Sequence, residues 1–250
     1  MRVTVISVIL GLVAASVSAI SPDQLPTRSA TDGMWLMRPV DPQTGENFGM
    51  IPGAFVRAAR AKLDGVADMA VFGMATERLS LAAAPDDKRS LSVSEMTPGA
   101  LRVVGIPPII GREFSDEDLR GVAVALVTYQ VWQGHFGGRP DAVGDRLWRG
   151  APGQPRDPVI IVGVLPRDFF QRVPVADSAA EAFTPSNVFV RRGMADGSFA
   201  PLLRLRPGVA IDKVRAEVNQ AVDSVRGQVG DPVGKLNARL DPADRPGWKK

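Results

Sequence analysis

An uninterrupted apolar stretch at the N-terminus most constrains what this chain can fold into. After Met1 and Arg2, the residues from Val3 to Ile20 carry no charge, and their only polar members are Thr and Ser. About 20 apolar residues cross a bilayer as a helix, and a basic residue ahead of them orients the N-terminus toward the cytoplasm. The stretch is apolar on every side, which disfavours a buried core helix. We therefore expect residues 1–22 to be a transmembrane helix or a signal peptide.

Two outcomes stay open for this stretch. Val17 and Ala19 are small residues with the spacing that signal peptidase requires, so cleavage after Ala19 would release a secreted protein. Without cleavage, the helix would anchor the chain in the membrane. In both cases we expect residues 23–33, which are rich in Pro, Ser and Thr, to form a linker. The folded part would then lie outside the cytoplasm.

Composition removes several classes of function. The chain has no cysteine, which excludes disulfides, thiolate metal sites and cysteine nucleophiles. Its single histidine, His135, cannot by itself form a histidine zinc site or a Ser-His-Asp triad. Lysine and arginine total 30 against 27 acidic residues, so no nucleic-acid partner is expected. Neither a P-loop nor a dinucleotide-binding glycine pattern occurs, so we expect no nucleotide hydrolysis by this chain.

The hydrophobic periodicity predicts a mixed α+β fold of short elements. A helix is expected from Ala54, and another from Thr97 as N-cap with Pro98 in its first turn and Gly105 after its end. A third helix, from Ile211, carries one apolar stripe closed by Gly227. Residues 229–250 are polar and are expected to form a loose tail. Strands are predicted at 34–40, 69–75, 78–84, 122–127, 145–148, 159–165, 188–192 and 202–206.

The segment from Val124 to Trp148 predicts a strand, a helix and a returning strand. The strand is nearly continuous in apolar residues, which is typical of burial on both faces. Trp132 and Phe136 follow at helical spacing, which favours core packing over an exposed partner-binding patch. The pair Gly137-Gly138 follows the helix instead of opening one, so we interpret it as a helix end and not a phosphate loop. His135 is interpreted as a packing or surface residue.

The acidic residues offer one candidate metal site. Glu113, Asp116, Glu117 and Asp118 lie close in sequence, but the alternate spacing of a calcium loop around a central glycine is missing. Ser115 followed three residues later by Asp118 resembles a capping box. We therefore expect the cluster to cap a helix and predict no metal site. The pair Asp86-Asp87 is expected to be a solvated turn, and no residue is assigned a catalytic or cofactor-binding role.

The order of these segments resembles the MacB-like periplasmic core domain of ABC-transporter permeases, of the FtsX/MacB type. The most specific matches are Trp132-Gln133, Phe136-Gly137-Gly138 and Val143-Gly144, followed by Val162-Gly163-Val164-Leu165-Pro166. The resemblance implies a domain over 34–228 with two lobes. A βαβ-rich porter-like lobe would hold residues 34–40, the helix from Ala54, residues 202–206 and the helix from Ile211. A second α+β lobe would be inserted at about 76–187.

The resemblance also implies a function. It indicates a non-catalytic periplasmic domain, held at the inner membrane, that transmits conformational change or binds a partner or exported substrate. ATPase or permease subunits and a periplasmic partner would work with it, and no cofactor is implied. The sequence departs from the family pattern at Ala210, where a capping Ser or Thr is frequent, and at Arg149 to Pro158, where the hairpin turn is longer.

Further membrane helices are expected in such permeases, and none is encoded after Lys250. A truncated product, a fragment and a single-span protein therefore stay open. The alternative function is a secreted, stand-alone binding module with a pocket between its lobes.

Overall fold

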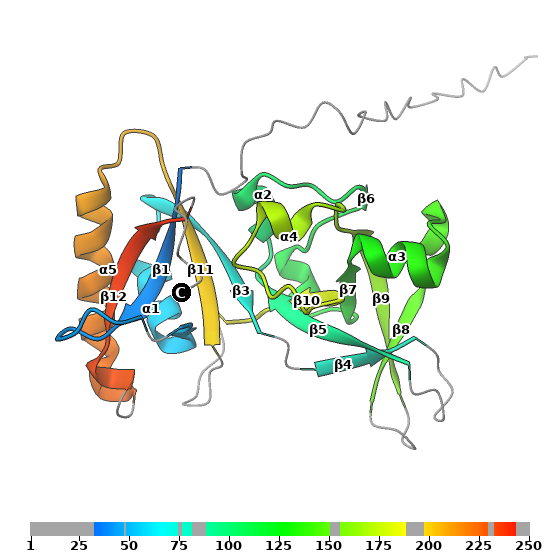
Figure 1. Ribbon diagram of the computed structural model, residues 1–250, viewed down its shortest axis with the longest axis horizontal. Helices are drawn as coiled ribbons and strands as arrows, with labels where there is room; N and C mark the ends of the chain where they lie inside the picture. Colours follow the sequence, from blue (N-terminus) through cyan, green and yellow to red (C-terminus); the bar gives the residue numbers. More distant parts are fainter. Residues whose placement is uncertain are drawn as a thin grey trace, which may run out of the picture.

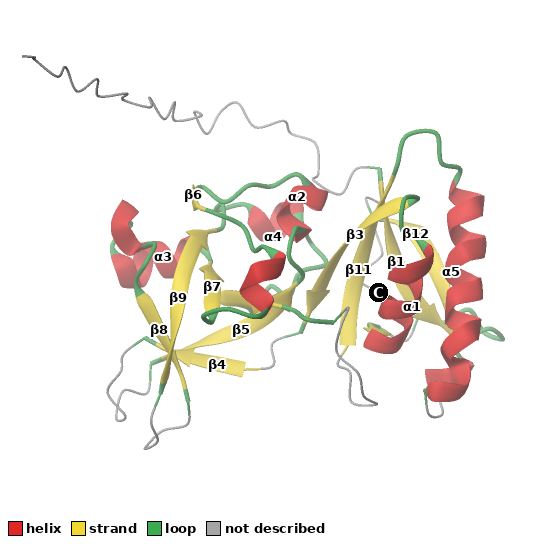
Figure 2. Cartoon of the chain, turned by 180° about the vertical axis from the view of Figure 1, so that it is seen from behind, coloured by secondary structure: helices red, strands yellow, loops and turns green. Residues whose placement is uncertain are grey.

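The computed structural model describes residues 33–47, 49–74, 77–81, 89–150, 156–188, 198–229 and 233–243. Figure 1 shows two halves side by side, and Figure 2 shows the same division from behind. We call residues 34–74 together with 198–243 the first half, and residues 77–188 the inserted half. The inserted half thus interrupts the first half between two strands that are neighbours in one sheet.

The first half is a four-stranded antiparallel sheet with two helices. Its elements follow the chain order β-α-β-β-α-β, and the strands lie in the order β3-β11-β1-β12. This order is that of a split βαβ, or ferredoxin-like, unit. The two-residue strand β2 pairs with β11 at the margin of the sheet. The elements are β1 (Met34–Val40), β2 (Ile51–Pro52), α1 (Gly53–Lys62), β3 (Ala67–Gly73), β11 (Ser198–Leu205), α5 (Ile211–Val225) and β12 (Asn237–Pro242).

Apolar stripes on the two helices form the core of this half. The predicted stripe on α5 is confirmed, because Val214, Val218, Ala221 and Val222 are all buried. These side chains share a core with Phe55, Val56 and Ala59 of α1 and with one face of the sheet. Ala210 makes no side-chain cap, and α5 continues into a 3-10 helix at Arg226–Gln228 in place of the predicted stop at Gly227.

Strand β12 corrects the expectation of a loose polar tail. It runs antiparallel to β1 over six residue pairs, from Trp35 opposite Pro242 to Val40 opposite Asn237. Ala238 and Leu240 enter the core with α5, while Arg239 between them is exposed. Two apolar residues among charged neighbours give only a short alternation, which explains why the sequence pattern did not indicate a strand. A second 3-10 helix, Val233–Lys235, precedes it.

The inserted half is a ring of six strands. They lie in the order β10-β7-β9-β8-β4-β5, and β5 pairs with β10 to close the ring. Closure leaves this sheet without open edges, which are otherwise sites of unwanted strand pairing. Apolar side chains from all six strands fill the inside. The strands are β4 (Glu77–Ser80), β5 (Ser90–Met96), β7 (Val124–Val127), β8 (Arg146–Arg149), β9 (Asp157–Val164) and β10 (Ala182–Pro185).

Short helices and one short strand surround the ring. The strand β6 (Ile110–Gly111) pairs with β9, and 3-10 helices span Asp116–Leu119 and Pro140–Ala142. The α-helices are α2 (Ala100–Val104), α3 (Tyr129–Phe136) and α4 (Phe169–Arg172). Sequence patterns did not indicate β5 or β10. The strand predicted at 188–192 begins in a turn at Val188, and the rest of it lies outside the described residues.

The predicted strand, helix and hairpin around Gly137-Gly138 are confirmed. All four residues of β7 are buried, but the strand starts at Val124, where its pairing with β9 begins, and Val122 before it is 65% exposed. Thr128 caps α3 by accepting a hydrogen bond from the Val131 amide at 3.3 Å. The two glycines have φ angles of 63° and 68°, and the chain returns as β8, which pairs antiparallel with β9.

Trp132 and Phe136 correct the expectation that this aromatic pair is fully in the core. Both are partly buried and pack against the apolar filling of the ring from outside. The Trp132 indole Nε1 donates a hydrogen bond to the Arg139 carbonyl at 2.8 Å. A tryptophan side chain at the margin of a core commonly keeps such a polar contact. Helical spacing in the sequence does not distinguish a position at the margin of the core from a fully buried one.

Two glycines allow β6 to pack tightly on β9. They lie opposite each other in the pairing of Gly111 with Gly163. A Cβ atom on Gly163 would lie 2.7 Å from the Arg112 carbonyl oxygen and 3.0 Å from that of Ile110. Gly111 has a φ of 79°, and a Cβ atom there would overlap the Val162 carbonyl oxygen. The glycine in the Val162-Gly163-Val164 motif is therefore required because the backbone of β6 lies too close to it for a side chain.

A shared core joins the two halves. The face of the first-half sheet away from α1 and α5 contributes Met34, Leu36, Phe72 and other residues to a cluster that includes Phe169 and Phe183 of the inserted half. At the edge of this cluster, the Thr97 amide donates a hydrogen bond to the Val71 carbonyl at 3.0 Å. The halves are thus packed together through apolar contacts as well as through the connecting chain.

Thr97 also corrects the predicted start of α2. Its Oγ1 accepts a hydrogen bond from the Val71 amide at 3.1 Å, so the hydroxyl joins the two halves and does not cap the helix. Gly99 then adopts a left-handed φ of 73°, and α2 begins at Ala100. The predicted left-handed Gly105 at the end of α2 is confirmed.

The described chain begins and ends at the same place. The Ala243 amide donates a hydrogen bond to the Met34 carbonyl at 2.9 Å, so the start of β1 and the end of β12 are adjacent. The apolar stretch from Val3 to Ile20 lies outside the described residues. Within the described part of the chain, none of the helices combines the length and apolar character that crossing a membrane requires.

Candidate functional site: a charged cleft between the halves

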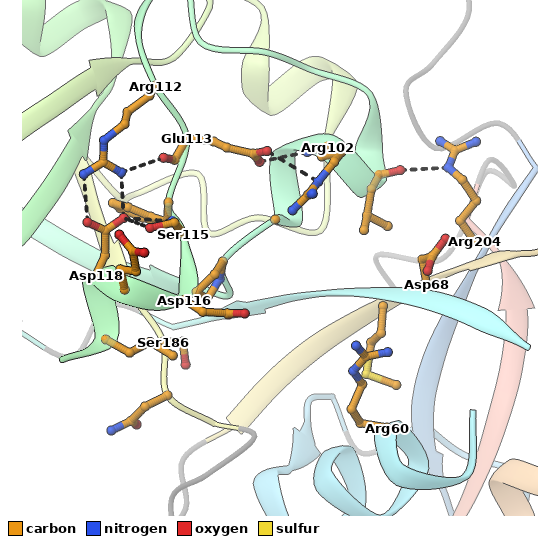
Figure 3. A pocket seen from close by; sticks show the side chains of 18 residues that line it. Arg60, Asp68, Arg102, Arg112, Glu113, Ser115, Asp116, Asp118, Ser186 and Arg204 are labelled. Atoms are coloured by element: carbon orange, nitrogen blue, oxygen red, sulfur yellow. Dashed lines mark hydrogen bonds and ion pairs between the residues drawn. The ribbon is translucent and has the colours of Figure 1, made fainter. Parts of the chain in front are cut away.

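A cleft of about 920 Å³ separates the two halves on one side of their shared core. The first half contributes Arg60 from α1, Asp68 from β3 and Arg204 from β11. The inserted half contributes the segments 98–103 and 112–119, together with Ser186 and Asn187. Figure 3 shows these side chains converging from both halves. The wall is strongly charged, with arginines and carboxylates on both sides.

The acidic cluster predicted to cap a helix does so. Ser115 and Asp118 form a capping box at the 3-10 helix Asp116–Leu119, and the Ser115 amide donates to Asp118 Oδ2 at 2.8 Å. Arg112 donates two hydrogen bonds to the same carboxylate, at 2.7 and 2.8 Å. These bonds from Arg112 hold the pKa of Asp118 below its usual range, and they raise the pKa of Arg112. The hydrogen bonds of Asp118 thus stabilise this turn.

Glu113 is held in a second local arrangement. One of its oxygens accepts a hydrogen bond from the Arg102 amide at 3.1 Å, and the other lies 3.5 Å from Arg102 Nε. The carboxylate therefore fixes α2 against the loop that follows it. Within the described residues, no group of three or more His, Asp or Glu side chains is arranged to hold a metal ion.

Arg204 bridges the cleft. From β11 its Nε donates a hydrogen bond to the Val103 carbonyl of α2 at 2.7 Å, as the dashed line in Figure 3 shows. A carbonyl near a helix C-terminus lacks an intrahelical partner, so a guanidinium from the opposite half satisfies it. Asp68 is engaged nearby by Arg206 at 3.1 Å. A similar contact elsewhere joins Arg57 of α1 to the Val188 carbonyl at 3.4 Å.

The charges are distributed unequally over the cleft. In the inserted half the carboxylates outnumber the arginines, and Asp116 and Glu117 are exposed, whereas the first half brings Arg60 and Arg204 against the single carboxylate of Asp68. Opposed acidic and basic walls suit attraction between the halves or the binding of a ligand carrying both charges.

The charged residues that the first half contributes to the cleft could not be found from the sequence. Arg60, Asp68 and Arg204 lie far apart in the chain, and each is a partly buried residue on its own helix or strand with no distinguishing sequence pattern around it. Glu113, Asp116, Glu117 and Asp118 were identified because they are neighbours in sequence. His135 lies elsewhere, exposed near the end of α3, and Asp86-Asp87 lies outside the described residues.

Comparison with known proteins identifies the class of this fold and then its family. The fold is similar to that of the extracellular domain of one ABC-type transporter and of the periplasmic region of MacB. The family model described as the MacB-like periplasmic core domain matches residues 3–221. The chain therefore belongs to the family of MacB-like periplasmic core domains, as the resemblance in its sequence indicates. Among curated proteins, no relative matches this sequence.

Solved structures agree on the fold. A domain from Porphyromonas gingivalis, from a protein described as a permease, superposes with a TM-score of 0.58 at 20% identity, over 86% of this chain and 93% of that one. The extracellular domain of the noncanonic ABC-type transporter YknZ from Gram-positive bacteria gives 0.55 at 14% identity, over 82% and 99%. The periplasmic region of MacB from Actinobacillus actinomycetemcomitans gives 0.56 at 11% identity, over 86% and 91%.

Proposed function

We propose that this chain is the non-catalytic extracytoplasmic domain of an ABC-transporter permease, anchored by its N-terminal apolar stretch. In this role it transmits conformational change between membrane segments and a partner outside the cytoplasm. The observation that carries the proposal is the adjacency of the two ends of the fold, where Ala243 is bonded to Met34. A domain inserted between membrane segments needs its entry and exit on one side, and this arrangement supplies it.

Transmission of movement also requires a stiff body. The shared core and the bonds from Thr97 to Val71 and from Arg204 to Val103 join the halves at separate points. Packed interiors resist compression and pass displacement on as rigid bodies. A movement imposed at the start of β1 would therefore reach the far end of the inserted half. ABC permeases work with ATPase subunits, which we propose as partners, with the domain on the periplasmic side of the inner membrane.

The placement can be tested with thiol labelling because the chain lacks cysteine. Val122→Cys introduces one thiol at a side-chain position that is 65% exposed. In cells with a permeabilised outer membrane, a maleimide that cannot cross the inner membrane should label this variant before lysis. The cysteine-free chain gives the background. Labelling that appears only after the inner membrane is broken would place the domain in the cytoplasm and contradict the proposal.

The second candidate is a secreted binding module, which the 920 Å³ cleft favours. Its opposed charges would suit a zwitterionic ligand. Such a protein would lose its N-terminal stretch and would keep its ligand through gentle purification. Native mass spectrometry of the mature protein would detect the extra mass. Arg204→Ala and Asp116→Ala should both remove it, whereas Val122→Ala, remote from the cleft, should not.

A further inference from the structure

An exposed apolar turn of the inserted half lies on the side of the molecule where the chain ends meet. It comprises Pro107, Pro108 and Ile109, between α2 and β6. Ile109 is 46% exposed, which makes it one of three large hydrophobic residues exposed in the described part of the chain. The other two, Met74 and Val122, lie elsewhere. Figures 1 and 2 both show the segment from α2 to β6 along the same side of the molecule as the start of β1.

The turn is held in this place by its flanks. The Ile109 amide donates to the Val164 carbonyl at 2.9 Å, and the Arg112 amide donates to that of Val162 at 2.9 Å. The two prolines restrict φ, and Ile106 before them is fully buried. Exposure of Ile109 is thus built into a fixed backbone and does not follow from a loose loop.

A shallow groove continues this apolar surface. It has a volume of about 350 Å³ and is lined by Leu101, Gly105, Ile106 and both prolines, with Arg102 and Glu113 at its margin. The Arg102 side chain is 76% exposed. An apolar tip beside an exposed guanidinium matches the boundary between the acyl chains and the anionic headgroups of a bilayer.

The chain itself indicates what this surface faces. Arg204 is the register partner of Met34, the first residue of β1, and it donates a hydrogen bond to the Val103 carbonyl of α2, so the helix that the turn follows lies near the point where the N-terminal segment joins the fold. Residues 21–32 separate the apolar stretch from this point. Twelve residues span at most about 40 Å when fully extended. An anchored apolar stretch therefore keeps this end of the fold within reach of the membrane surface.

We infer that the turn Pro107-Pro108-Ile109 docks on the lipid bilayer, with Ile109 entering the boundary of the acyl chains and Arg102 facing lipid phosphates. The inference rests on the proposed anchoring. Docking gives the domain a second point of support, so that its tilt relative to the membrane is set by the inserted half as well as by the chain ends.

The test uses the full chain reconstituted in vesicles of phosphatidylethanolamine and phosphatidylglycerol. Ile109→Cys and Val122→Cys each carry one environment-sensitive fluorophore. Val122 is the matched control, since it is exposed and precedes β7, whose far end lies beside Val164 and hence beside Ile109. The five residue steps from Val122 to Val127 separate the two positions by roughly 16 Å along the extended chain. Lipids with brominated acyl chains then quench fluorophores that enter the bilayer.

The expected result is quenching and a blue shift for the label at 109, with neither for the label at 122. Flotation of the unlabelled chain with the vesicles tests the anchoring separately. Flotation without quenching at 109 would overturn the docking and leave the anchor intact. Quenching at 122 equal to or greater than that at 109 would also overturn it. A chain that does not float with the vesicles would refute the proposed anchoring, and with it the docking that depends on the anchor.

Discussion

The first half and the inserted half are stabilised in different ways. In the first half, two amphipathic helices cover an antiparallel sheet, and the apolar stripes that build its core are visible in the sequence of α5. In the inserted half, six short strands close a ring whose tight packing depends on glycines such as Gly163. The comparison teaches that one half is specified by periodic apolar patterns and the other by local backbone geometry, and that a shared core makes them one body.

The largest effect is expected for Phe183→Ala, which tests whether the halves form one body. Phe183 is fully buried in the shared core, with its ring 5.7 Å from that of Phe169. Removing a buried phenyl ring costs about 3 to 5 kcal/mol of unfolding free energy. Denaturant unfolding should remain a single transition at lower denaturant. Two separated transitions in the unmodified chain would show that the halves unfold independently and would break the comparison.

Leu240→Ala tests whether β12 belongs to the first half. Leu240 is 2% exposed and packs in the core with α5. A Leu to Ala change at a buried site costs about 2 to 5 kcal/mol. Arg239→Ala is the matched control. Arg239 is the neighbour of Leu240 in the strand and its side chain is exposed, so the change should have little effect on the free energy of unfolding. Equal melting temperatures for Leu240→Ala and the unmodified chain would restore the interpretation of a loose tail.

Gly163→Ala tests whether the close packing of the β6 backbone on β9 is needed for the stability of the inserted half. The added methyl group would meet two carbonyl oxygens at 3.0 Å or less, so β6 must move. Overpacking of this kind costs about 1 to 3 kcal/mol. Gly134→Ala is the control, because a Cβ atom there has no neighbour within 4 Å and the residue lies in α3. That change should stabilise the helix by about 0.5 to 1 kcal/mol. Thermal unfolding should show a lower melting temperature for Gly163→Ala and a higher one for Gly134→Ala.

Gly138→Val should have an effect of about 1 kcal/mol or slightly more. The residue has a φ of 68°, a region that a β-branched side chain rarely adopts. A Cβ atom there would also meet the Gln133 amide group, which is exposed and can turn away. The cost is therefore mainly backbone strain. Chemical denaturation measures it, and an unchanged unfolding free energy would refute the helix-end interpretation of Gly137-Gly138.

The smallest effect concerns pH and the capping box at Asp118. Its pKa is held below the usual range by Arg112, so the ionised form stabilises the fold at neutral pH. This contribution is present above about pH 4, the ordinary pKa of aspartate, and is lost as the pH falls through the lower folded value. Asp118→Asn should reduce stability at pH 7 and weaken the acid dependence. An unchanged acid dependence in urea unfolding would show that Arg112 does not hold this carboxylate.

The difference between the halves also explains how much could be predicted from the sequence. The helix from Ile211, the buried strand before Thr128 and the glycine helix end were recognised because each depends on residues close in sequence. The strand β12 was missed since Ala238 and Leu240 give too short an alternation. The alternative function included a pocket between the lobes, but the residues that line the cleft were missed for another reason. Arg60 and Arg204 meet the acidic segment only after the inserted half has folded back on the sheet, and no local pattern contains that information.

The central claim is that an N-terminal anchor holds this domain outside the cytoplasm. Fractionation of cells expressing the full chain, followed by N-terminal sequencing of the mature protein, tests it most directly. The account predicts a protein in the membrane fraction that still begins at the original N-terminus. A soluble protein beginning at Ile20 would contradict it and would favour the secreted binding module.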